Sequence, residues 1–465
     1  MESQKLILVT GGAGYVGSHC LIELLSNGFD AVVIDNCSNS IQLGQQSMPE
    51  SLLRIEKLTG RKLIAFYKLD INDQACLERI FIEHRFDAVM HFAALKSVAE
   101  SCRMPLKYYR NNVGGTMVLL DVMEKFSVKK LIFSSSATVY GRPEYLPIDE
   151  NHRTGTELTS SYGRTKYFIE EILKDLSHSD PDWSIVSLRY FNPVGAHESG
   201  EIGEDPLGVP NNLMPFISQV AVGRRPYLKV FGNDFKTADG TGVRDYIHIM
   251  DLARGHLMAL KMIVEEETKN TKGWNVFNFG AGRGYSVLDV LKAFETSTKV
   301  RIAFKFCDRR DGDVDELWAR IIKVRERFNW QPRFDLDAMC LHSWKWQNNY
   351  PFGYRTSQRR IESIPNNIDR SLNEEKSNLD EDDNSELLSI RYDHYQDETS
   401  NFNQEKNSCF SNNNIDSNTN SHCNHNGNKE RNHLKNNQEL LKTKFFNKKL
   451  KCFQFEVNNN EEDIV

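Results

Sequence analysis

The sequence lacks the features of membrane, exported and nucleic-acid-binding proteins. Its 465 residues contain no run of about 18 apolar residues, the length that spans a bilayer. The start, MESQKLILVTGG, has neither the basic leader nor the long apolar stretch of a signal peptide. A net charge of −6 provides no basic excess for binding a polyanion. We therefore expect a cytosolic protein that acts on neither membranes nor nucleic acids.

Patterned cysteines are also missing. Nine cysteines extend from Cys20 to Cys452 without a CxxC pair, a spacing that fits neither a disulfide framework nor a zinc site. A reducing compartment and no bound metal are expected. The one local group of ligand-type residues is irregularly spaced in a polar setting, which favours an incidental cluster over a metal site: His422, Cys423, His425 and His433.

The composition changes near Tyr350. Up to there, apolar runs alternate with Gly and Asn/Asp turns, whereas 18 of the 65 residues from Asn401 onward are Asn. Such a composition cannot bury enough apolar surface to offset chain entropy. We predict that residues 351–465 form a low-complexity, disordered tail. Its segment 444–457, KFFNKKLKCFQFEV, is locally amphipathic, which leaves a docking role open.

Short apolar runs rich in Val, Ile and Leu alternate with helix-like segments in the first part of the chain. The runs lie at 6–10, 31–35, 88–94, 131–136 and 185–190. Because they are apolar throughout, they are typical of strands buried on both faces of a parallel sheet. The sequence predicts an α/β fold in which helices cover both faces of such a sheet, with its ligands at the carboxyl ends of the strands.

A smaller lobe is expected to interleave with this sheet. After Asn192, the Gly-, Pro- and Asn-rich stretches 203–216 and 231–246 have the character of ordered functional loops. We predict a first domain over 1–190 with returns near 244–258 and 274–280. A substrate-binding α/β lobe would then comprise 191–243 and 281–350.

The first strand runs directly into a glycine-rich turn. Gly11, Gly14 and Gly17 have GxxGxxG spacing and open the helix SHCLIELLSNG. In this context Gly11 permits the tight turn, Gly14 lets the backbone approach a pyrophosphate and Gly17 lets helix and strand pack closely. The motif predicts a dinucleotide with its phosphates at the helix N-terminus.

An acidic residue at the end of the second strand predicts which dinucleotide binds. Asp35 can accept hydrogen bonds from ribose hydroxyls and would repel a 2′-phosphate, so NAD is favoured over NADP. No Arg follows it, since the next residues are Asn36, Cys37, Ser38 and Asn39. Asp70 and Ile71, after the next strand, could hold the adenine edge, although Asp70 could equally cap a helix.

Three residues suggest proton transfer on an alcohol. Tyr162 and Lys166 stand at i and i+4, on one face of a helix. Ser136 ends the strand LIFSSS, where the cofactor cleft should open. Lys166 and a bound nicotinamide would lower the pKa of the Tyr162 phenol, which could then act as a general base. Ser136 would bind the same substrate hydroxyl.

Seven motifs together resemble the extended short-chain dehydrogenase/reductase family, and within it the branch that acts on carbon 4 of UDP-sugars. They are TGGAGYVGSH, VVIDN, SSSATVYG, YGRTK, RYFNPVGAH, NNLMPF and TGVRDYIHIMDLA. The likeness runs from about Lys5 to Tyr350 and leaves the tail uncovered. It implies a Rossmann-type doubly wound sheet, tightly bound NAD and a homodimer formed through helices near 105–125 and 165–176. The activity implied is interconversion of UDP-glucose and UDP-galactose through a transient 4-keto sugar.

The resemblance also implies residue roles. Tyr162 would be the base, with Lys166 as its pKa partner and a ribose ligand, and Ser136 the hydroxyl-binding residue. The remaining cofactor residues implied are Tyr15, Val16, Phe92, Lys96, Asn112 and Tyr190. The UDP-sugar would contact Lys96, Ala137, Thr138, Tyr190, Phe191, Asn192, Asn211, Asn212, Leu213, Lys229, Val230, Phe231, Arg244, Arg310 and Asp313. Guanidinium groups such as those of Arg244 and Arg310 suit a diphosphate.

Several alternatives stay open. A nucleotide-sugar dehydratase shares the Tyr/Lys pair but needs a further acid/base group, and Ala137 and Thr138 after Ser136 supply no carboxylate. A decarboxylase would differ by releasing CO2. A nucleotide-binding sensor without turnover is a third possibility. Leu317 falls where relatives differ in side-chain size, so acceptance of N-acetylated UDP-sugars is undecided. Arg320, in the atypical segment 314–330, stands near the expected uridine site.

Overall fold

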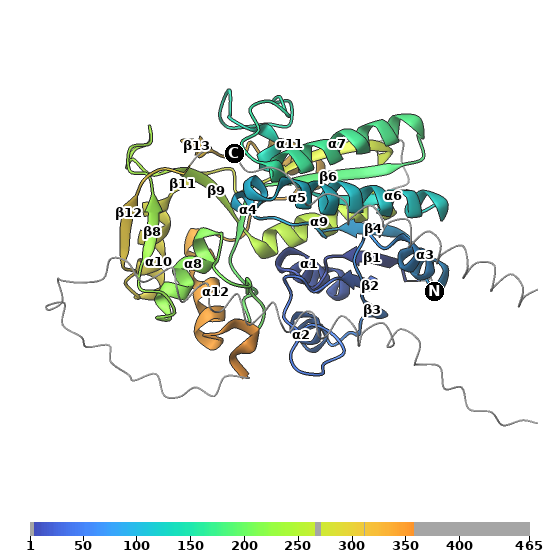
Figure 1. Cartoon of the computed structure of the whole chain (residues 1–465), viewed down its shortest axis with the longest axis horizontal. Helices are drawn as coiled ribbons and strands as arrows, with labels where there is room; N and C mark the ends of the chain where they lie inside the picture. The colour runs from blue at the N-terminus through green and yellow to red at the C-terminus, as the bar shows by residue number, and fades with distance from the viewer. Residues whose placement is uncertain (1–3, 266–270, 311, 358–465) are drawn as a thin grey trace, which may run out of the picture. The chain divides into compact units, whose positions relative to one another are not determined.

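The computed structural model describes residues 4–265, 271–310 and 312–357 (Figure 1). Its main layer is a seven-stranded sheet in the order β10-β6-β5-β4-β1-β2-β3, with every neighbouring pair parallel. The strands are β1 Leu6–Thr10, β2 Asp30–Asp35, β3 Ala65–Lys68, β4 Ala88–His91, β5 Lys130–Ser136, β6 Ser184–Tyr190 and β10 Gly273–Phe279.

Helices cover both faces of this sheet because its strands are apolar on both sides. Within β1, Val9 belongs to one apolar core and Leu8 to the other. The first core takes in α1 Tyr15–Ser26, α2 Glu50–Thr59, α9 Ile249–Glu265 and α11 Ile322–Phe328. The second takes in α3 Gln74–Glu83, α6 Gly115–Lys125 and α7 Ser161–Ser179. The predicted doubly wound parallel sheet is confirmed.

The strand order determines where a ligand crevice forms at the carboxyl ends of the strands. From β1 the chain builds β2 and β3 toward one edge, and then β4, β5, β6 and β10 toward the other. The order therefore reverses between β1 and β4. In an open parallel sheet, the loops that leave the carboxyl ends of two such strands diverge and leave a crevice between them. The glycine-rich turn after β1 lies at this crevice.

The smaller lobe is built on two short sheets, which confirms the second part of the predicted fold class. Strands β7 Asn192–Val194, β9 Val243–His248, β11 Gly284–Ser286 and β13 Glu316–Leu317 form one sheet. Strands β8 Leu228–Phe231 and β12 Phe304–Cys307 form the other. Its core includes α8 Leu213–Ala221, α10 Val287–Thr298 and α12 Leu336–Asn349. The chain was expected to return to the first domain near 244–258. There, the helix α9 packs on the large sheet, whereas the strand β9 pairs in the smaller lobe.

Short helices complete the described chain. They are α4 Val98–Arg103, α5 Pro105–Tyr108, a π-helix at Tyr109–Gly114, and 3-10 helices at Ala137–Tyr140 and Gly353–Ser357. None of the described helices combines the length and apolar character that a membrane span requires.

Two boundaries differ from the sequence predictions. The strand expected over 88–94 ends at His91, and the chain after it turns into the crevice. The predicted start of the tail at residue 351 is too early. Tyr354 is only 5% exposed, and its backbone N–H donates a hydrogen bond to the Asp205 carboxylate. The rest of the predicted tail, 358–465, lies outside the described residues, as do its His/Cys group and the segment 444–457.

Candidate active site

The turn between β1 and α1 has the shape of a phosphate cradle. Gly11 has φ +70°, and a Cβ on it would lie 2.6 Å from the backbone nitrogen of Ala93. Gly17 packs directly against the carbonyl oxygen of Gly11, so a side chain there would force the helix away from the strand. Helix α1 begins at Tyr15, which points its N-terminus at the crevice. The turn therefore fits a pyrophosphate.

Asp35 stands where a ribose carboxylate ligand is needed. It ends β2, next to the glycine turn, and is 8% exposed. Burial raises its pKa, whereas hydrogen bonds from the backbone N–H groups of Cys37 and Ala13, at 2.8 and 3.1 Å, lower it. Two donors fix the carboxylate while leaving it at the pocket wall. Together with the glycine turn, this arrangement fits a dinucleotide.

The start of α7 brings Tyr162 and Lys166 to the pocket. Ser160 caps the helix by accepting a hydrogen bond from the Gly163 N–H at 3.1 Å, so Tyr162 lies in the first turn. Lys166 is 3% exposed, and its Nζ donates to the carbonyl oxygen of Ser134 at 2.5 Å. Ser136 at the end of β5 lines the same pocket. A phenol, an ammonium and a hydroxyl thus meet at one wall.

The pKa values at this wall are governed by burial. Burial raises the pKa of Tyr162 to about 12, and a hydrogen bond with Ser136 partly offsets the rise. Burial lowers the pKa of Lys166 to about 7, against the opposing charge of Glu170. Desolvation thus disfavours both the phenolate and the lysine cation in the chain alone, and the predicted lowering of the Tyr162 pKa, which calls for Lys166 and a bound nicotinamide together, stays a prediction.

Twenty of the residues predicted from the sequence line this one pocket, which runs from the glycine turn to the carboxyl ends of β5 and β6. They are Gly11, Gly14, Tyr15, Val16, Gly17, Asp35, Asn36, Ser38, Asn39, Ile71, Phe92, Lys96, Ser136, Thr138, Tyr162, Lys166, Tyr190, Phe191, Asn192 and Asn212. Residues far apart in the chain therefore converge as a cofactor and substrate site would require.

Six other predicted residues lie beside the pocket without lining it: Cys37, Asp70, Asn112, Ala137, Asn211 and Leu213. Asp70 accepts a hydrogen bond from Asn36 at 2.9 Å, so it supports a lining residue. Asn112 is fully buried; it donates to the carbonyl oxygen of Leu95 at 3.0 Å and to Thr165 at 3.1 Å. It therefore ties the chain after β4 to α7.

The remaining predicted residues form a second group in the smaller lobe: Lys229, Val230, Phe231, Arg244, Arg310 and Asp313. Asp313 accepts from Arg310 at 3.0 and 3.2 Å and lies 3.9 Å from Arg244. The Arg310 guanidinium lies 5.0 Å from the centre of the Phe231 ring. Val230 is buried, whereas Lys229 is exposed. Two guanidinium groups beside an aromatic ring suit a nucleoside diphosphate.

The atypical segment 314–330 folds against both lobes. Leu317 in β13 pairs with Arg244 in β9, so it lies beside the arginine group. The Arg320 N–H donates to the carbonyl oxygen of Ile148 at 2.7 Å, and its side chain lies 3.9 Å from Asp149. Arg320 therefore contacts the segment formed by Ile148 and Asp149.

The structure adds pocket residues that the sequence did not single out. Glu204 lines the pocket and pairs with Lys96 at 2.7 Å, and Tyr354 lines it from the end of the described chain. Tyr190 contacts His256 at 2.5 Å; His256 Nδ1 lies 2.9 Å from the carbonyl oxygen of Leu252. For Glu204, the sequence did hold a usable signal, because the acidic segment GED lies within the expected functional loop 203–216. Tyr354 had none, because it falls in the assumed tail.

Metal ligands do not gather in the described part of the chain. Across residues 4–265, 271–310 and 312–357, no three His, Cys, Asp or Glu side chains are grouped in a way that could hold an ion.

Comparisons with known proteins agree with this geometry. The family model described as GDP-mannose 4,6 dehydratase matches residues 8–342. The UDP-glucose 4-epimerase of Drosophila melanogaster is 53% identical over 349 residues, 75% of this chain and 98% of that protein. That of Bacillus subtilis is 49% identical over 352 residues, covering 76% and 99%.

Solved structures give the same result. The UDP-glucose 4-epimerase of Bifidobacterium longum, in complex with NAD+ and UDP, superposes with a TM-score of 0.70 at 46% identity, covering 75% of this chain and 100% of that one. With about half of the aligned residues identical over nearly the full length of these relatives, the chain belongs to the UDP-glucose 4-epimerases, within the extended short-chain dehydrogenase/reductase family of NAD-dependent epimerases and dehydratases.

Proposed function

We propose that this protein interconverts UDP-glucose and UDP-galactose by inverting carbon 4 of the sugar, with NAD as a bound cofactor. The observation that carries the proposal is the convergence of Tyr162, Lys166 and Ser136 on one pocket with the glycine turn and Asp35. Relatives that are identical at about half of the aligned positions carry the name of this activity. NAD, when bound, supplies a reversible hydride acceptor.

The roles of the chain's own residues follow from their positions. Ser136 binds the 4-hydroxyl of the sugar and holds it against Tyr162. Tyr162, as the phenolate, takes the hydroxyl proton and later returns it. Lys166 stabilises that phenolate when it carries its proton, since an adjacent positive charge favours the ionised form. Lys166 is buried and Tyr162 is half-buried at the pocket wall, so a bound substrate would shield the proton from bulk water.

The smaller lobe would hold the nucleotide while the sugar turns. Inversion requires that first one face and then the other face of the 4-keto sugar be turned toward the cofactor. The protein must therefore hold the substrate mainly through its UDP part. Phe231 of β8, Arg244 of β9 and Arg310 lie outside the catalytic pocket, in the smaller lobe, and suit an aromatic base and a diphosphate. We infer that residues 1–190 hold NAD and this lobe holds UDP.

The direct test is to incubate the purified protein with UDP-galactose and follow UDP-glucose by chromatography. Formation of an equilibrium mixture without net NADH supports the proposal. Loss of water from UDP-galactose would indicate a dehydratase, and release of CO2 from a UDP-uronic acid, tested as a separate substrate, would indicate a decarboxylase. The same assay with UDP-N-acetylgalactosamine decides whether the site beside Leu317 accepts N-acetylated sugars.

A dehydratase is disfavoured by the residues after Ser136. Ala137 is buried, and the Thr138 hydroxyl donates a hydrogen bond to the Ser136 hydroxyl at 3.0 Å. Neither side chain can deliver or remove a proton at a second carbon, as elimination of water requires. A non-catalytic sensor would have no need of the Tyr162 and Lys166 pair.

Arg244 should matter more for binding than for chemistry. Replacing Arg244 with Met removes a charge-assisted contact to the diphosphate, which is made equally in the ground and transition states. We expect KM for UDP-galactose to rise by about tenfold to a hundredfold with a smaller change in kcat. Steady-state kinetics of R244M and of the matched variant R283M, which alters an exposed arginine, check this. Equal effects in both would exclude the role.

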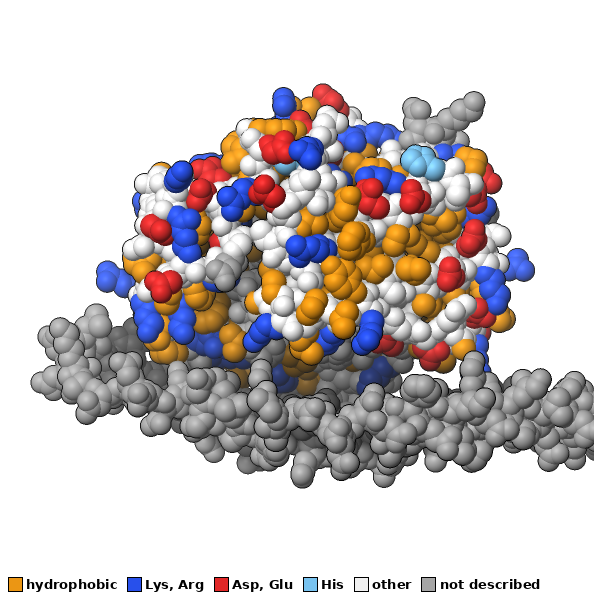
Figure 2. Space-filling model, turned by 45° about the horizontal axis from the view of Figure 1, so that its top comes forward, with side chains coloured by type: hydrophobic (Ala, Val, Ile, Leu, Met, Phe, Trp, Pro, Cys, Tyr) orange, Lys and Arg blue, Asp and Glu red, His pale blue; other side chains and the backbone are white. Residues whose placement is uncertain are grey.

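We also propose that the protein is a homodimer. A groove formed by the π-helix and α7 is lined by Tyr109, Arg110, Val113, Gly114, Phe168, Glu171, Ile172 and Asp175. Around it, large apolar side chains are exposed: Leu106 at 64%, Met117 at 49% and Phe168 at 43%. Figure 2 shows apolar side chains gathered on the face that this view brings forward. A patch of this kind is typical of a subunit interface.

Replacing Phe168 with Glu should convert the dimer into a monomer, because it buries a carboxylate in the centre of the proposed interface. Sedimentation velocity measures the change. The control is Ile82 to Glu, an equally polar change at a side chain that is 71% exposed on α3. If wild type sediments as a monomer, the proposed interface is wrong.

A cytosolic location is proposed as well. No disulfide joins the described cysteines, which include the buried Cys20 and the exposed Cys102. Fractionation of the cells that express the protein checks this.

A further inference from the structure

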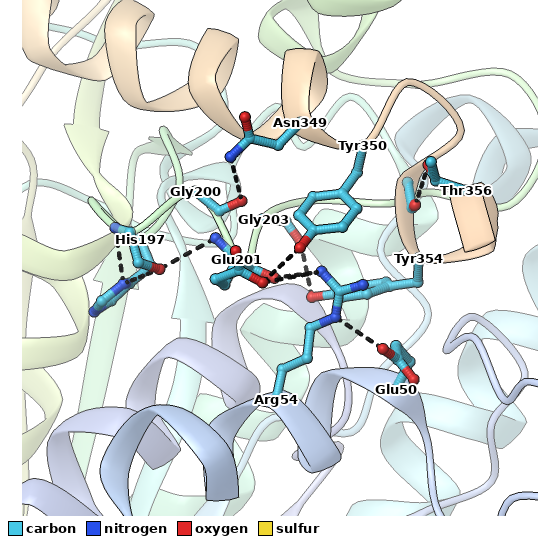
Figure 3. Close-up of polar contacts among 12 residues, drawn as sticks. Glu50, Arg54, His197, Gly200, Glu201, Gly203, Asn349, Tyr350, Tyr354 and Thr356 are labelled. Carbon is cyan, nitrogen blue, oxygen red and sulfur yellow. Dashed lines mark hydrogen bonds and ion pairs between the residues drawn. The ribbon is translucent and has the colours of Figure 1, made fainter. Parts of the chain in front are cut away.

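A cluster of side chains at the edge of the pocket takes no part in the proposed reaction. Figure 3 shows Arg54 of α2 next to Tyr350 and Tyr354, which follow α12. Its guanidinium lies 4.0 Å from the centre of the Tyr350 ring and 5.1 Å from that of Tyr354. Its Nε donates to Glu50 at 2.9 Å. The cation is thus held by aromatic faces and a carboxylate together.

The same side chains hold the loop that enters the pocket. Arg54 donates to the carbonyl oxygen of Glu201 at 2.9 Å. The Tyr350 hydroxyl donates to the Glu201 carboxylate at 2.5 Å, and that of Tyr354 to the carbonyl oxygen of Gly203 at 3.4 Å (Figure 3). Both ends of this short loop segment are therefore bonded to the cluster.

The packing leaves the loop little freedom to shift. Trp346 is 3% exposed and donates its indole N–H to the carbonyl oxygen of Glu204 at 3.3 Å. Gly203 lies flat on the Trp346 ring, where a Cβ would overlap it. Asp205 is held by the Tyr354 N–H at 2.9 Å and by Arg355 at 3.3 Å.

Beyond these contacts the loop crosses the pocket. Residues 203–206 line it. Glu204 pairs with Lys96 at 2.7 Å on one side, and the Leu207 N–H donates to Asn39 at 3.3 Å on the other. Lys96 and Asn39 both line the pocket and both belong to the first domain. A dinucleotide in the pocket could not leave past this side until the loop moved.

We propose that Arg54, Trp346, Tyr350 and Tyr354, here called the clasp, are positioning residues that keep the loop closed over the cofactor. The clasp sets the rate at which NAD leaves the protein. This inference rests on the proposed function, because it takes NAD as the occupant of the pocket. The clasp lies outside the reacting groups, so it changes cofactor retention without changing the chemistry.

The test measures exchange of bound NAD. Protein that carries NAD is mixed with excess radiolabelled NAD, and the label retained after rapid gel filtration is followed over time. Replacing Arg54 with Met keeps the length of the side chain but removes its charge, its hydrogen bonds and its ring contacts. We expect exchange at least about tenfold faster than in wild type, with KM for UDP-galactose unchanged. R54K, which keeps the charge, should recover part of the retention.

Two further variants separate the clasp from general stability. Lys57 to Met removes an exposed charge from the same helix and should exchange NAD at the wild-type rate. Tyr350 to Phe removes only the hydroxyl bonded to Glu201 and should exchange moderately faster; it carries the test if R54M does not fold. Wild-type exchange rates in R54M and Y350F would overturn the clasp. A wild-type protein that binds no NAD would instead overturn the proposed function.

Discussion

Replacing Tyr162 with Phe is expected to lower the turnover of UDP-galactose by about 10³-fold, since the variant lacks the proposed general base for the hydroxyl proton. The ring stays in place, so the packing at the start of α7 is preserved. NAD should remain bound at the wild-type ratio, because the glycine turn and Asp35 are untouched. The measurement is the initial rate of UDP-glucose formation together with the NAD content of the purified variant.

The matched control is Tyr167 to Phe. Tyr167 is five residues further along α7, packs against Gly155 and does not line the pocket. Its activity should stay within a factor of two or so of wild type, the size expected for a change away from the reacting groups. Substantial turnover by Y162F would show that another group acts as the base, and the assignment would fail.

Replacing Glu170 with Gln should destabilise the protein by about 3–5 kcal/mol, the range for removing one partner of a buried ion pair. Glu170 and Arg189 are 0% and 2% exposed, and their side chains bond at 2.6 and 3.0 Å. Ser135 also donates to Glu170 at 2.6 Å. The change leaves the Arg189 cation buried without its counter-charge. Urea denaturation followed by circular dichroism measures the loss.

Glu144 to Gln is the control for this effect. Glu144 pairs with Arg153 at 3.4 Å, with side chains that are 52% and 69% exposed, so water screens the pair. No measurable change in the free energy of unfolding is expected there. Equal stability losses in the two variants would show that burial of the Glu170 pair does not matter.

The ion pair also bears on catalysis. Glu170 lies one turn after Lys166 and ties α7 to β6 through Arg189 and to β5 through Ser135. These two strands end at Tyr190 and Ser136. We therefore expect Glu170, through Ser135, to help set the distance between the helix that carries Tyr162 and the strand that carries Ser136.

The fold and much of the pocket were predictable because their signals are local. A strand, a GxxGxxG turn and a helix follow one another within residues 6–26, and each residue type has a direct steric reason. Asp35 and Ser136 were found because they stand at the ends of apolar runs. Parallel strands bring such ends to one edge of a sheet, so sequence order alone predicted that they would converge.

Other features depend on contacts between distant segments. Tyr354 reaches the pocket only because Arg54 and Asp205 bind the residues after α12. Gly115 looks like a weak point in a helix, yet a Cβ there would lie 2.6 Å from the Cδ1 atom of Ile71. The pKa of Tyr162 depends on burial, which the i, i+4 spacing does not report. Arg189 did leave a signal, since a lone charge in an apolar strand requires a buried partner.

The central claim is that one hydrogen leaves carbon 4 and returns to the same carbon from the other side. UDP-galactose carrying deuterium at carbon 4 tests it most directly, with the UDP-glucose product examined by mass spectrometry and NMR. The account predicts UDP-glucose that keeps the deuterium at carbon 4, with no loss to water and no accumulation of NADH. Deuterium released to solvent, or product formed without inversion at carbon 4, would contradict it.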